Sequence, residues 1–516
     1  MPGKTEESRQ TIKNSVGRAV LVAISVLLQV FWIVLLVMRL NQYYAYISLA
    51  TSVLSFLVVL HICGNKINAA YKLSWIVLIQ FMPILGLCLF LMFGKESSNA
   101  VMRRRFGRID QQMPRYLPQD EATAARLDAE NPGLGNQAHY LRNTAGFPVY
   151  GDTRVTFYGD TNEALEAQKA ELRKAEHFIF MEYHAIEDST AWRGLEEILA
   201  EKAAAGVDVR VFYDDMGSIG FISKPFARRL QAQGIQCRVF NPLVPVLNVF
   251  MNNRDHRKIT VVDGQVGFTG GYNLADEYFN LTHPYGQWKD SGLRLEGSAV
   301  RSLTVIFLEM WNATQKVQED PTPFLVPAAV PQGAGGYVIP YADSPLDTIA
   351  TGEDVYLNIL KNAKRYVYIT TPYLIIDDEM QRELTLAARR GVDVRIITPG
   401  IPDKKTVFRV TRSYYADLAT AGVRIFEYTP GFVHAKQFVA DDEVATCGTI
   451  NMDYRSLYLH FENGCWFSSC DAVAQVRRDF EELFPLCTEV TGQYAGKRER
   501  YVRGLNCILR LFGPLM

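Results

Sequence analysis

The sequence lacks an excess of charge of either sign. It contains 54 Lys and Arg residues against 55 Asp and Glu residues. Proteins that bind the phosphate backbone of nucleic acids usually carry a clear basic excess or a basic stripe. We therefore expect no nucleic-acid partner.

Clustered cysteines are also missing. The eight cysteines fall at no spacing typical of zinc ligands, and the closest pair, Cys465 and Cys470, has no accompanying His or Cys residues at ligand spacing. We expect reduced thiols, no metal site and no other cofactor.

Charged residues are absent from three N-terminal stretches, residues 19–38, 43–62 and 73–93. About 20 apolar residues in a helix cross the roughly 30 Å hydrocarbon core of a bilayer. We predict an anchor over residues 1–95 with three transmembrane helices, which makes this an integral, multi-pass membrane protein. The Lys and Arg residues that flank these stretches number six on each face of the membrane. The orientation of the anchor therefore stays open.

The remainder of the chain contains an internal repeat. The pentapeptide GVDVR occurs at residues 206–210 and again at 391–395, each time between a helical stretch and a β-branched strand. An apolar strand precedes each copy, Phe178–Tyr183 in the first and Tyr366–Thr371 in the second. A glycine between a helix and a strand is typical of an α-to-β turn.

The repeat predicts an α/β fold of two similar half-domains related by a pseudo-two-fold axis. We expect a basic linker at 96–135, half-domain 1 at 136–335, half-domain 2 at 336–490 and a basic amphipathic tail at 491–516. The tail either lies on anionic lipid or packs on the catalytic part, and the sequence favours neither. An apolar insertion, residues 243–251, lengthens the first copy before its motif histidine.

One motif, His-x-Lys-x-x-x-x-Asp, appears at equivalent places in both copies. It comprises His256, Lys258 and Asp263 in the first half, and His434, Lys436 and Asp441 in the second. Residues i and i+2 of a strand point to one face, so each histidine should project together with its lysine. One such motif alone would carry little weight, but recurrence within a repeat indicates a shared site.

These side chains suit phosphodiester exchange, which needs a nucleophile, a proton donor for the leaving alcohol and cations for the phosphoryl oxygens. Two imidazoles can divide the first two tasks, and Lys258 and Lys436 can supply the cations. Asn273 and Asn451, which follow the motifs, are candidates for further hydrogen-bond donors. This chemistry requires no metal.

The paired motifs resemble those of the phospholipase D superfamily, and nearly the whole chain resembles its bacterial cardiolipin synthases. The segments that carry the resemblance include MEYHAIEDS at Glu182, GGYNLADEY at 270–278, TPYLIIDDE at 371–379 and TINMDYRS at 449–456. The resemblance implies an enzyme of the bacterial cell membrane that transfers a phosphatidyl group between two phosphatidylglycerol molecules. It implies cardiolipin and glycerol as products, a phosphohistidine intermediate and contact with anionic lipid.

The resemblance also implies roles for individual residues. His256 is expected to be the nucleophile and His434 the acid and base, although the symmetry of the sequence does not distinguish them. We assign Asp290 as the carboxylate partner of His256, and Glu462 as that of His434. We count Asp263 and Asp441 with the catalytic motifs, while expecting them to hold loops more than to touch substrate.

Three alternatives remain for the activity. The same motifs serve lipid hydrolases and phosphatidylserine synthases, and a non-catalytic membrane scaffold could retain the fold. Intact His256, Lys258, His434 and Lys436 argue against a scaffold. His184 has no lysine two residues on and no counterpart in the second half, so we expect it to line the site and not to react. The oligomeric state stays open.

Overall fold

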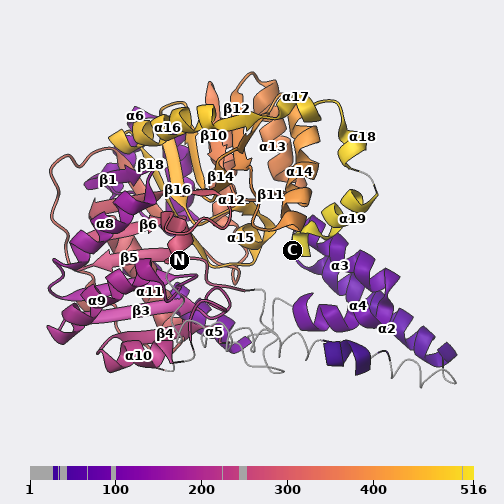
Figure 1. Ribbon diagram of the computed structural model, residues 1–516, viewed down its shortest axis with the longest axis horizontal. Helices are drawn as coiled ribbons and strands as arrows, with labels where there is room; N and C mark the ends of the chain where they lie inside the picture. Colours follow the sequence, from indigo (N-terminus) through magenta and orange to yellow (C-terminus); the bar gives the residue numbers. More distant parts are fainter. Residues whose placement is uncertain are drawn as a thin grey trace.

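The computed structural model describes residues 27–32, 34, 44–66, 68–94, 100–223, 225–242, 253–315, 317–502 and 504–515. Two α/β halves form the body of the molecule, and N-terminal helices project from one side of it (Figure 1). The apolar insertion at 243–251 lies outside the described residues.

The first half is built on a seven-stranded mixed sheet in the order β1-β8-β6-β5-β2-β3-β4. Strands β2, β3 and β4 run parallel, and the other neighbours pair antiparallel. The strands are β1 (Thr153–Tyr158), β2 (Phe178–Tyr183), β3 (Asp208–Asp214), β4 (Gln236–Phe240), β5 (Lys258–Val262), β6 (Val266–Gly270) and β8 (Gly292–Gly297).

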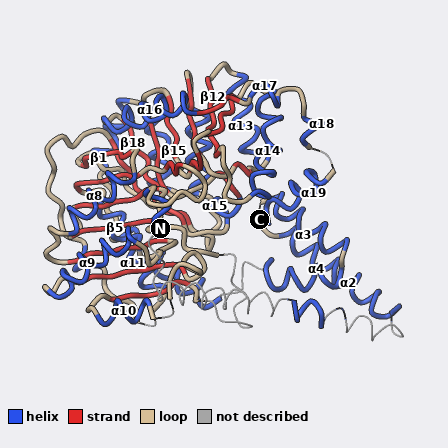
Figure 2. Tube along the Cα trace, in the orientation of Figure 1, coloured by secondary structure: helices blue, strands red, loops and turns tan. Residues whose placement is uncertain are grey.

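The second half repeats this arrangement strand for strand. Its eight-stranded sheet, read from β9, runs β9-β18-β16-β15-β10-β12-β13, and β19 is added at the end. The strands are β9 (Tyr337–Asp343), β10 (Tyr366–Thr370), β12 (Asp393–Pro399), β13 (Arg424–Tyr428), β15 (Gln437–Ala440), β16 (Val444–Gly448), β18 (Glu462–Ser468) and β19 (Cys487–Glu489). The predicted repeat of two α/β half-domains is therefore confirmed, and Figure 2 shows the two sheets as separate sets of strands.

Helices connect and cover the strands of both halves. Gly206 and Gly391 of the GVDVR repeats have φ of 92° and 94°, a left-handed conformation that lets a helix end two residues before the glycine and a strand begin two residues after it. The helices are α8 (Thr161–Leu172), α9 (Thr190–Ala204), α10 (Phe226–Ala232) and α11 (Val300–Ala313) in the first half, and α12 (Thr351–Asn362), α13 (Asp378–Arg389), α14 (Lys405–Thr420), α15 (Tyr454–Tyr458) and α16 (Asp471–Leu483) in the second.

The two halves share one apolar core. Helix α11 is almost wholly buried between them, and its Phe307 stacks on Phe180 with ring centroids 4.5 Å apart. The same cluster contains Val338 and Phe467 of the second half. Burial of this much apolar surface fixes the halves against each other, which a site at their junction requires.

The segment predicted as a basic linker is largely helical. It contains α5 (Ala100–Asp110) and α6 (Glu121–Glu130), and α7 (Pro132–Asn143) follows. Leu127 of α6 and Leu134 of α7 belong to the core of the second half, and Gln137 accepts a hydrogen bond from the indole of Trp466. Residues 121–143 are therefore packed on the core of half-domain 2.

The N-terminal region consists of α2 (Tyr44–Gly64), α3 (Ala69–Phe81), α4 (Pro83–Leu89) and a π-helical turn, η2 (Phe90–Gly94). Among the described residues we find no helix with the length and apolarity needed to cross a membrane. The predicted span at 73–93 is interrupted because Pro83 cannot continue helix α3 and starts α4 instead. Most of the predicted span at 19–38 lies outside the described residues.

The C-terminal tail forms α17 (Thr491–Tyr494), α18 (Arg498–Tyr501), α19 (Leu505–Phe512) and a final turn, η8 (Gly513–Leu515). Arg510 pairs with Asp417 of α14 at 3.0 Å, and the hydroxyl of Ser74 on α3 donates to the carbonyl of Leu511 at 2.7 Å. The tail thus joins the N-terminal helices to half-domain 2. Part of the tail is packed against α14 and α3, whereas Leu505 and Ile508 remain 54% and 55% exposed.

Candidate active site

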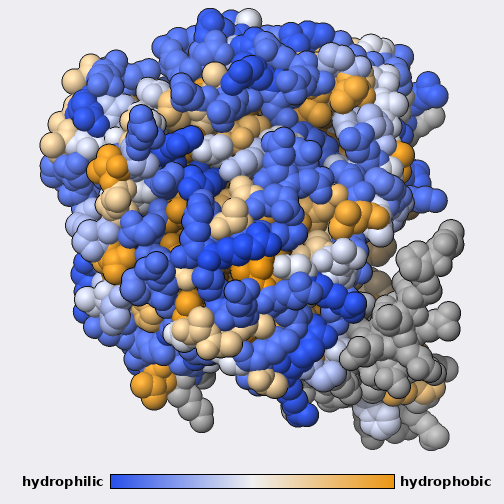
Figure 3. Space-filling view, turned by 60° about the vertical axis from the view of Figure 1, so that its left-hand side comes forward, coloured by the Kyte–Doolittle hydropathy of each residue, from blue (hydrophilic) through white to orange (hydrophobic). Residues whose placement is uncertain are grey.

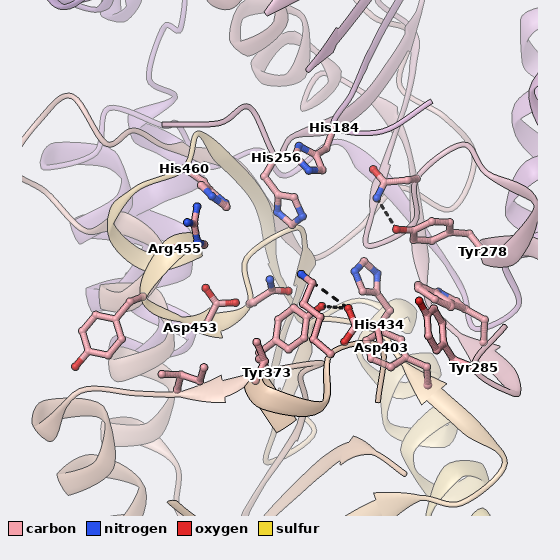
Figure 4. Close-up of a pocket in the computed structure, with 18 of the residues that line it drawn as sticks. His184, His256, Tyr278, Tyr285, Tyr373, Asp403, His434, Asp453, Arg455 and His460 are labelled. Carbon is pink, nitrogen blue, oxygen red and sulfur yellow. Dashed lines mark hydrogen bonds and ion pairs between the residues drawn. The ribbon is translucent and has the colours of Figure 1, made fainter. Parts of the chain in front are cut away.

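The two motif histidines line one cavity at the junction of the halves. The cavity has a volume of about 260 Å³. Figure 4 shows His460, Arg455 and Asp453 on one side of His256, and Tyr278, Tyr285 and Asp403 on the other side, near His434. The sequence-based prediction of two motifs in one place agrees with this geometry.

The backbone amide of each motif histidine donates a hydrogen bond to the opposite half. The short strand β14 (Gly431–Val433) pairs in parallel with β7 (Gln287–Lys289), and the amide of His434 donates to the carbonyl of Lys289 at 2.7 Å. On the other side, the amide of His256 donates to the carbonyl of Phe461 at 2.8 Å. Hydrogen bonds between the two halves therefore form at the backbone of each motif histidine.

This crossing exchanges the carboxylate partners. Nδ1 of His256 lies 2.9 and 2.8 Å from the two carboxylate oxygens of Glu462, and Nδ1 of His434 lies 2.7 Å from Oδ2 of Asp290. Our assignment from sequence, Asp290 to His256 and Glu462 to His434, was wrong. The physical reason is the pairing of β7 with β14, which carries Asp290 to the histidine of the other half.

The two dyads differ in their support. Thr449 donates a hydrogen bond from its hydroxyl to Glu462. The equivalent residue in the first half is Gly271, where an added Cβ would lie 2.1 Å from Oδ1 of Asp290. Glycine is required there because the carboxylate of Asp290 occupies that space. The near-identical motif ends, Gly-Gly and Gly-Thr, thus have different structural roles.

The motif lysines lie beside their own histidines. Lys258 donates to the carbonyl of His256 at 2.7 Å, and Nζ of Lys436 lies 2.8 Å from Nδ1 of His434. Burial lowers the pKa of Lys258 to about 8 and that of Lys436 to about 7. A bound phosphate would stabilise both ammonium forms.

Burial also affects the histidines. It lowers the pKa of His434 to about 3, assisted by the charge of Lys436 and opposed by Asp290. It lowers the pKa of His256 well below the ordinary value, and Lys258 adds to the shift. Both shifts favour the neutral imidazole, the form in which a histidine is a nucleophile.

The motif aspartates lie away from the cavity. Asp441 accepts hydrogen bonds from the amides of Lys364, Arg365 and Tyr366 at 2.6, 2.8 and 2.9 Å. Asp263 accepts equivalent bonds from residues 176–178 at 2.7 to 2.8 Å. Both aspartates have a left-handed φ, 51° for Asp263 and 58° for Asp441. They anchor the start of a neighbouring strand and do not face the histidines.

The asparagines and His184 line the cavity. Asn273 donates to the hydroxyl of Tyr278 at 2.8 Å and accepts from the amide of Ala185 at 3.1 Å, so it is already engaged in the protein. Asn451 is 6% exposed, and its Oδ1 has no hydrogen-bond partner among the described residues. His184 lies near the carbonyl of Asp255, with Nδ1 at 2.7 Å, and its ring lies 5.0 Å from that of His256.

His460 is a cavity residue that the sequence motifs did not single out. Its ring lies 5.7 Å from that of His256, and its Nδ1 is 3.6 Å from Glu462. The polar side-chain atoms of His256, His460 and Glu462 lie within 4.8 Å of one another, so the fold adds the distant His256 to a His460–Glu462 pair that is close in sequence and forms a set of potential metal ligands. The feature of the sequence that could have indicated His460 is its position two residues before Glu462.

The His434 side of the cavity is rich in tyrosines and carboxylates. Tyr373 donates to Asp403 at 2.5 Å, and Oδ1 of Asp403 has no hydrogen-bond partner among the described residues. Burial, with the charges of Glu187 and Asp403, raises the pKa of Glu277 to about 7. These residues lie outside the two His-x-Lys motifs, and Glu277 and Tyr373 fall within the segments 270–278 and 371–379.

Known protein families and structures match both halves of this architecture. A family model described as "Cardiolipin synthase, PLD-like domain" matches residues 169–311 and 356–484, one segment in each half. A second, described as "Phospholipase_D-nuclease N-terminal", matches residues 53–95. The crystal structure of phosphatidylserine synthase from Haemophilus influenzae Rd KW20 has a TM-score of 0.55 at 14% identity and covers 74% of this chain and 100% of that chain, a likeness of fold alone.

Relatives in sequence extend over most of the chain. An uncharacterized protein of Streptococcus mutans is 42% identical over 89% of this chain and 99% of its own length. A cardiolipin synthase of Halalkalibacterium halodurans is 33% identical over 86% of this chain and 88% of its own, and cardiolipin synthase 2 of Bacillus cereus is 34% identical over 86% of each. The chain therefore belongs to the phospholipase D-like cardiolipin synthase family.

Proposed function

We propose that this chain is a cardiolipin synthase that transfers a phosphatidyl group from one phosphatidylglycerol to a second, releasing glycerol. The observation that carries the proposal is a single cavity in which two neutral histidines, each on a carboxylate of the opposite half, stand beside two lysines. Membership of the cardiolipin synthase family supports the choice of a phosphatidyl transfer.

In the first step, Nε2 of His256 attacks phosphorus and the bond from phosphorus to the glycerol oxygen breaks. Glu462 holds Nδ1, so Nε2 carries the lone pair that reacts. His434 gives a proton to the departing oxygen, for which the negative phosphate of the bound lipid must first raise its pKa. The product is a phosphatidyl group covalently bound to His256.

In the second step, the terminal hydroxyl of a second phosphatidylglycerol attacks the same phosphorus. His434 takes the hydroxyl proton, a new phosphorus–oxygen bond forms and the phosphorus–nitrogen bond to His256 breaks. Lys258 and Lys436 offset the charge on the non-bridging oxygens in both steps. A residue that acts first as acid and then as base returns to its initial state after one cycle.

We also propose that the enzyme is attached to the bacterial cell membrane as a multi-pass protein through its N-terminal region. The described part of this region exposes large apolar side chains, including Leu57 on α2 and Leu73 and Phe81 on α3. The face of the catalytic body in Figure 3 is mainly hydrophilic, with apolar residues scattered over it. Retention in the membrane fraction after alkaline carbonate extraction tests this attachment.

The activity itself is tested with purified protein in mixed micelles of detergent and phosphatidylglycerol. We expect cardiolipin and free glycerol in equal amounts from the wild type, and no cardiolipin from His256→Ala. Phosphatidic acid as sole lipid product would show a hydrolase instead. Unchanged cardiolipin formation by His256→Ala would rule out the histidine mechanism.

A further inference from the structure

We propose that His460, Arg455 and Asn451 form a subsite for the phosphate-bearing glycerol headgroup of the acceptor lipid. This inference rests on the proposed function and deepens it. It explains how a phosphatidyl histidine can react with a second phospholipid in preference to water.

The chemistry of the acceptor sets the requirement. Its attacking hydroxyl and its own phosphate are attached to the two ends of one glycerol, so a second negative phosphate must lie close to the reaction centre. Lys258 and Lys436 are engaged with the phosphate of the donor. Among the described residues that line the cavity, the lysine and arginine side chains are Arg455 and Lys404.

The His460 side offers polar groups that are buried and not yet used. Both ring nitrogens of His460 are buried without a hydrogen bond among the described residues, although Nδ1 lies 3.6 Å from the carboxylate of Glu462, and the side chain is 12% exposed. Oδ1 of the buried Asn451 is in the same condition. A buried polar group left without a partner costs about 1–3 kcal/mol, so a ligand that supplies the missing hydrogen bonds binds there favourably.

Charge on this side is compatible with an anion. Arg455 lies beside His460 in Figure 4, with Asp453 below it. Asp453 accepts a hydrogen bond from the amide of Ser456 at 3.0 Å and so caps helix α15. A phosphate bound between His460 and Arg455 would favour the imidazolium form of His460 and add a charge-assisted hydrogen bond.

The opposite side of the cavity is unsuitable for a second phosphate. Lys404 is 64% exposed, and its Nζ lies 3.9 Å from Asp403 and 5.3 Å from the ring centroid of Tyr373. Asp403 and Glu277 both line this side. These carboxylates can accept hydrogen bonds from the hydroxyls of glycerol, and Lys404 is exposed to solvent and already lies near one of them.

The reaction through this subsite balances. The hydroxyl oxygen of the acceptor, held one glycerol away from its bound phosphate, forms a bond to the phosphorus on His256. The phosphorus–nitrogen bond breaks and the hydroxyl proton passes to His434. No further reactant is needed.

The experiment offers two soluble acceptors to the full-length enzyme in one vessel, with phosphatidylglycerol as donor. Glycerol and glycerol 1-phosphate, with different radiolabels, compete for the same intermediate and give phosphatidylglycerol and phosphatidylglycerol phosphate. A change in the formation of the intermediate affects both products equally, so their ratio reports on acceptor binding alone. We expect the wild type to use glycerol 1-phosphate at least ten times more efficiently than glycerol.

His460→Ala and Arg455→Met should each bring this ratio close to one. His460→Ala keeps the test falsifiable if the half-buried Arg455 is needed for folding. Lys404→Ala is the matched control, a cation of the same cavity on the other side, and should leave the ratio as in the wild type. A wild-type ratio near one, or a ratio that falls in Lys404→Ala but not in His460→Ala, would overturn the subsite. If the wild type labels no lipid from either acceptor but forms cardiolipin from phosphatidylglycerol alone, the subsite is overturned and the proposed transfer stands. If it forms no cardiolipin either, the proposed transfer fails.

Discussion

Glu462 lies in the second half of the chain, yet its carboxylate oxygens are 2.8 and 2.9 Å from Nδ1 of His256 in the first half. Asp290 makes the reciprocal contact with His434 at 2.7 Å. Each half therefore supplies the histidine of one dyad and the carboxylate of the other. Neither half contains a complete dyad, so we expect catalysis to require both.

The crossed dyads predict different defects for two carboxylate variants. Glu462→Gln should disable the nucleophile His256, and Asp290→Asn should disable the acid His434, each lowering the rate of cardiolipin formation by about 10²- to 10⁴-fold. A phosphatidyl donor with a p-nitrophenol headgroup needs no proton on its leaving oxygen. Asp290→Asn should therefore release p-nitrophenol in the first turnover nearly as fast as the wild type, while Glu462→Gln should not. The opposite pattern would contradict either the crossing or the assigned roles.

The sequence predicted much of this architecture. The two GVDVR turns and the paired His-x-Lys motifs identified the repeat, the two α/β halves and both histidines, because strand periodicity and turn chemistry are local properties. The partners of the histidines were not local. Asp290 follows the first motif in sequence, but the pairing of β7 with β14 places it in the other dyad.

Other differences have similar causes. Helices α6 and α7 pack on the second half although they precede the first, and sequence order gave no sign of that. The long apolar stretch at 73–93 suggested one helix, whereas Pro83 divides it. His460 shows no motif of its own, and only the junction of the halves brings it beside His256.

The motif lysines predict the alkaline side of the pH profile. Burial places the pKa of Lys436 at about 7 and that of Lys258 at about 8. The ammonium form binds the lipid phosphate and is lost as pH rises through these values, so kcat/KM should fall from about pH 7 upward. Lys436→Arg keeps its charge because a guanidinium stays protonated, which leaves Lys258 to titrate and moves the fall toward pH 8. A value of kcat/KM that stays constant from about pH 6 to about pH 9 would contradict the role of these two lysines.

Asp441 should matter for stability more than for chemistry. Asp441→Ala removes the acceptor of three backbone amides and places an alanine at a left-handed φ of 58°, which alanine rarely adopts. We expect a loss of about 2–4 kcal/mol in the free energy of unfolding. Asp441→Asn, which tolerates this conformation and keeps one acceptor oxygen, should lose about half as much.

Denaturant unfolding measures these losses, and active-site titration gives kcat per folded molecule. We expect kcat to change by less than about threefold in Asp441→Asn, since the side chain does not face the cavity. A large fall in kcat without loss of stability would instead assign Asp441 a part in the reaction.

The exposed apolar pair on α19 predicts contact of the tail with lipid. A tryptophan placed at Ile508 should be quenched by brominated phosphatidylglycerol in proteoliposomes, because this position is 55% exposed on an apolar and basic tail. Leu386→Trp on α13, at a position that is also exposed, serves as the control and should not be quenched. Equal quenching at both positions, or none at Ile508, would favour a tail that only packs on the protein.

The central claim is that phosphatidyl transfer passes through His256 with His434 as acid and base. The most direct measurement mixes enzyme with the p-nitrophenol donor, stops the reaction with detergent at alkaline pH within the first turnover, and locates the lipid phosphate on the protein by mass spectrometry. We predict a phosphatidyl group on the peptide that contains His256, retained in His434→Ala and absent from His256→Ala. A phosphatidyl group on His434, or none on either histidine during active turnover, would contradict the account.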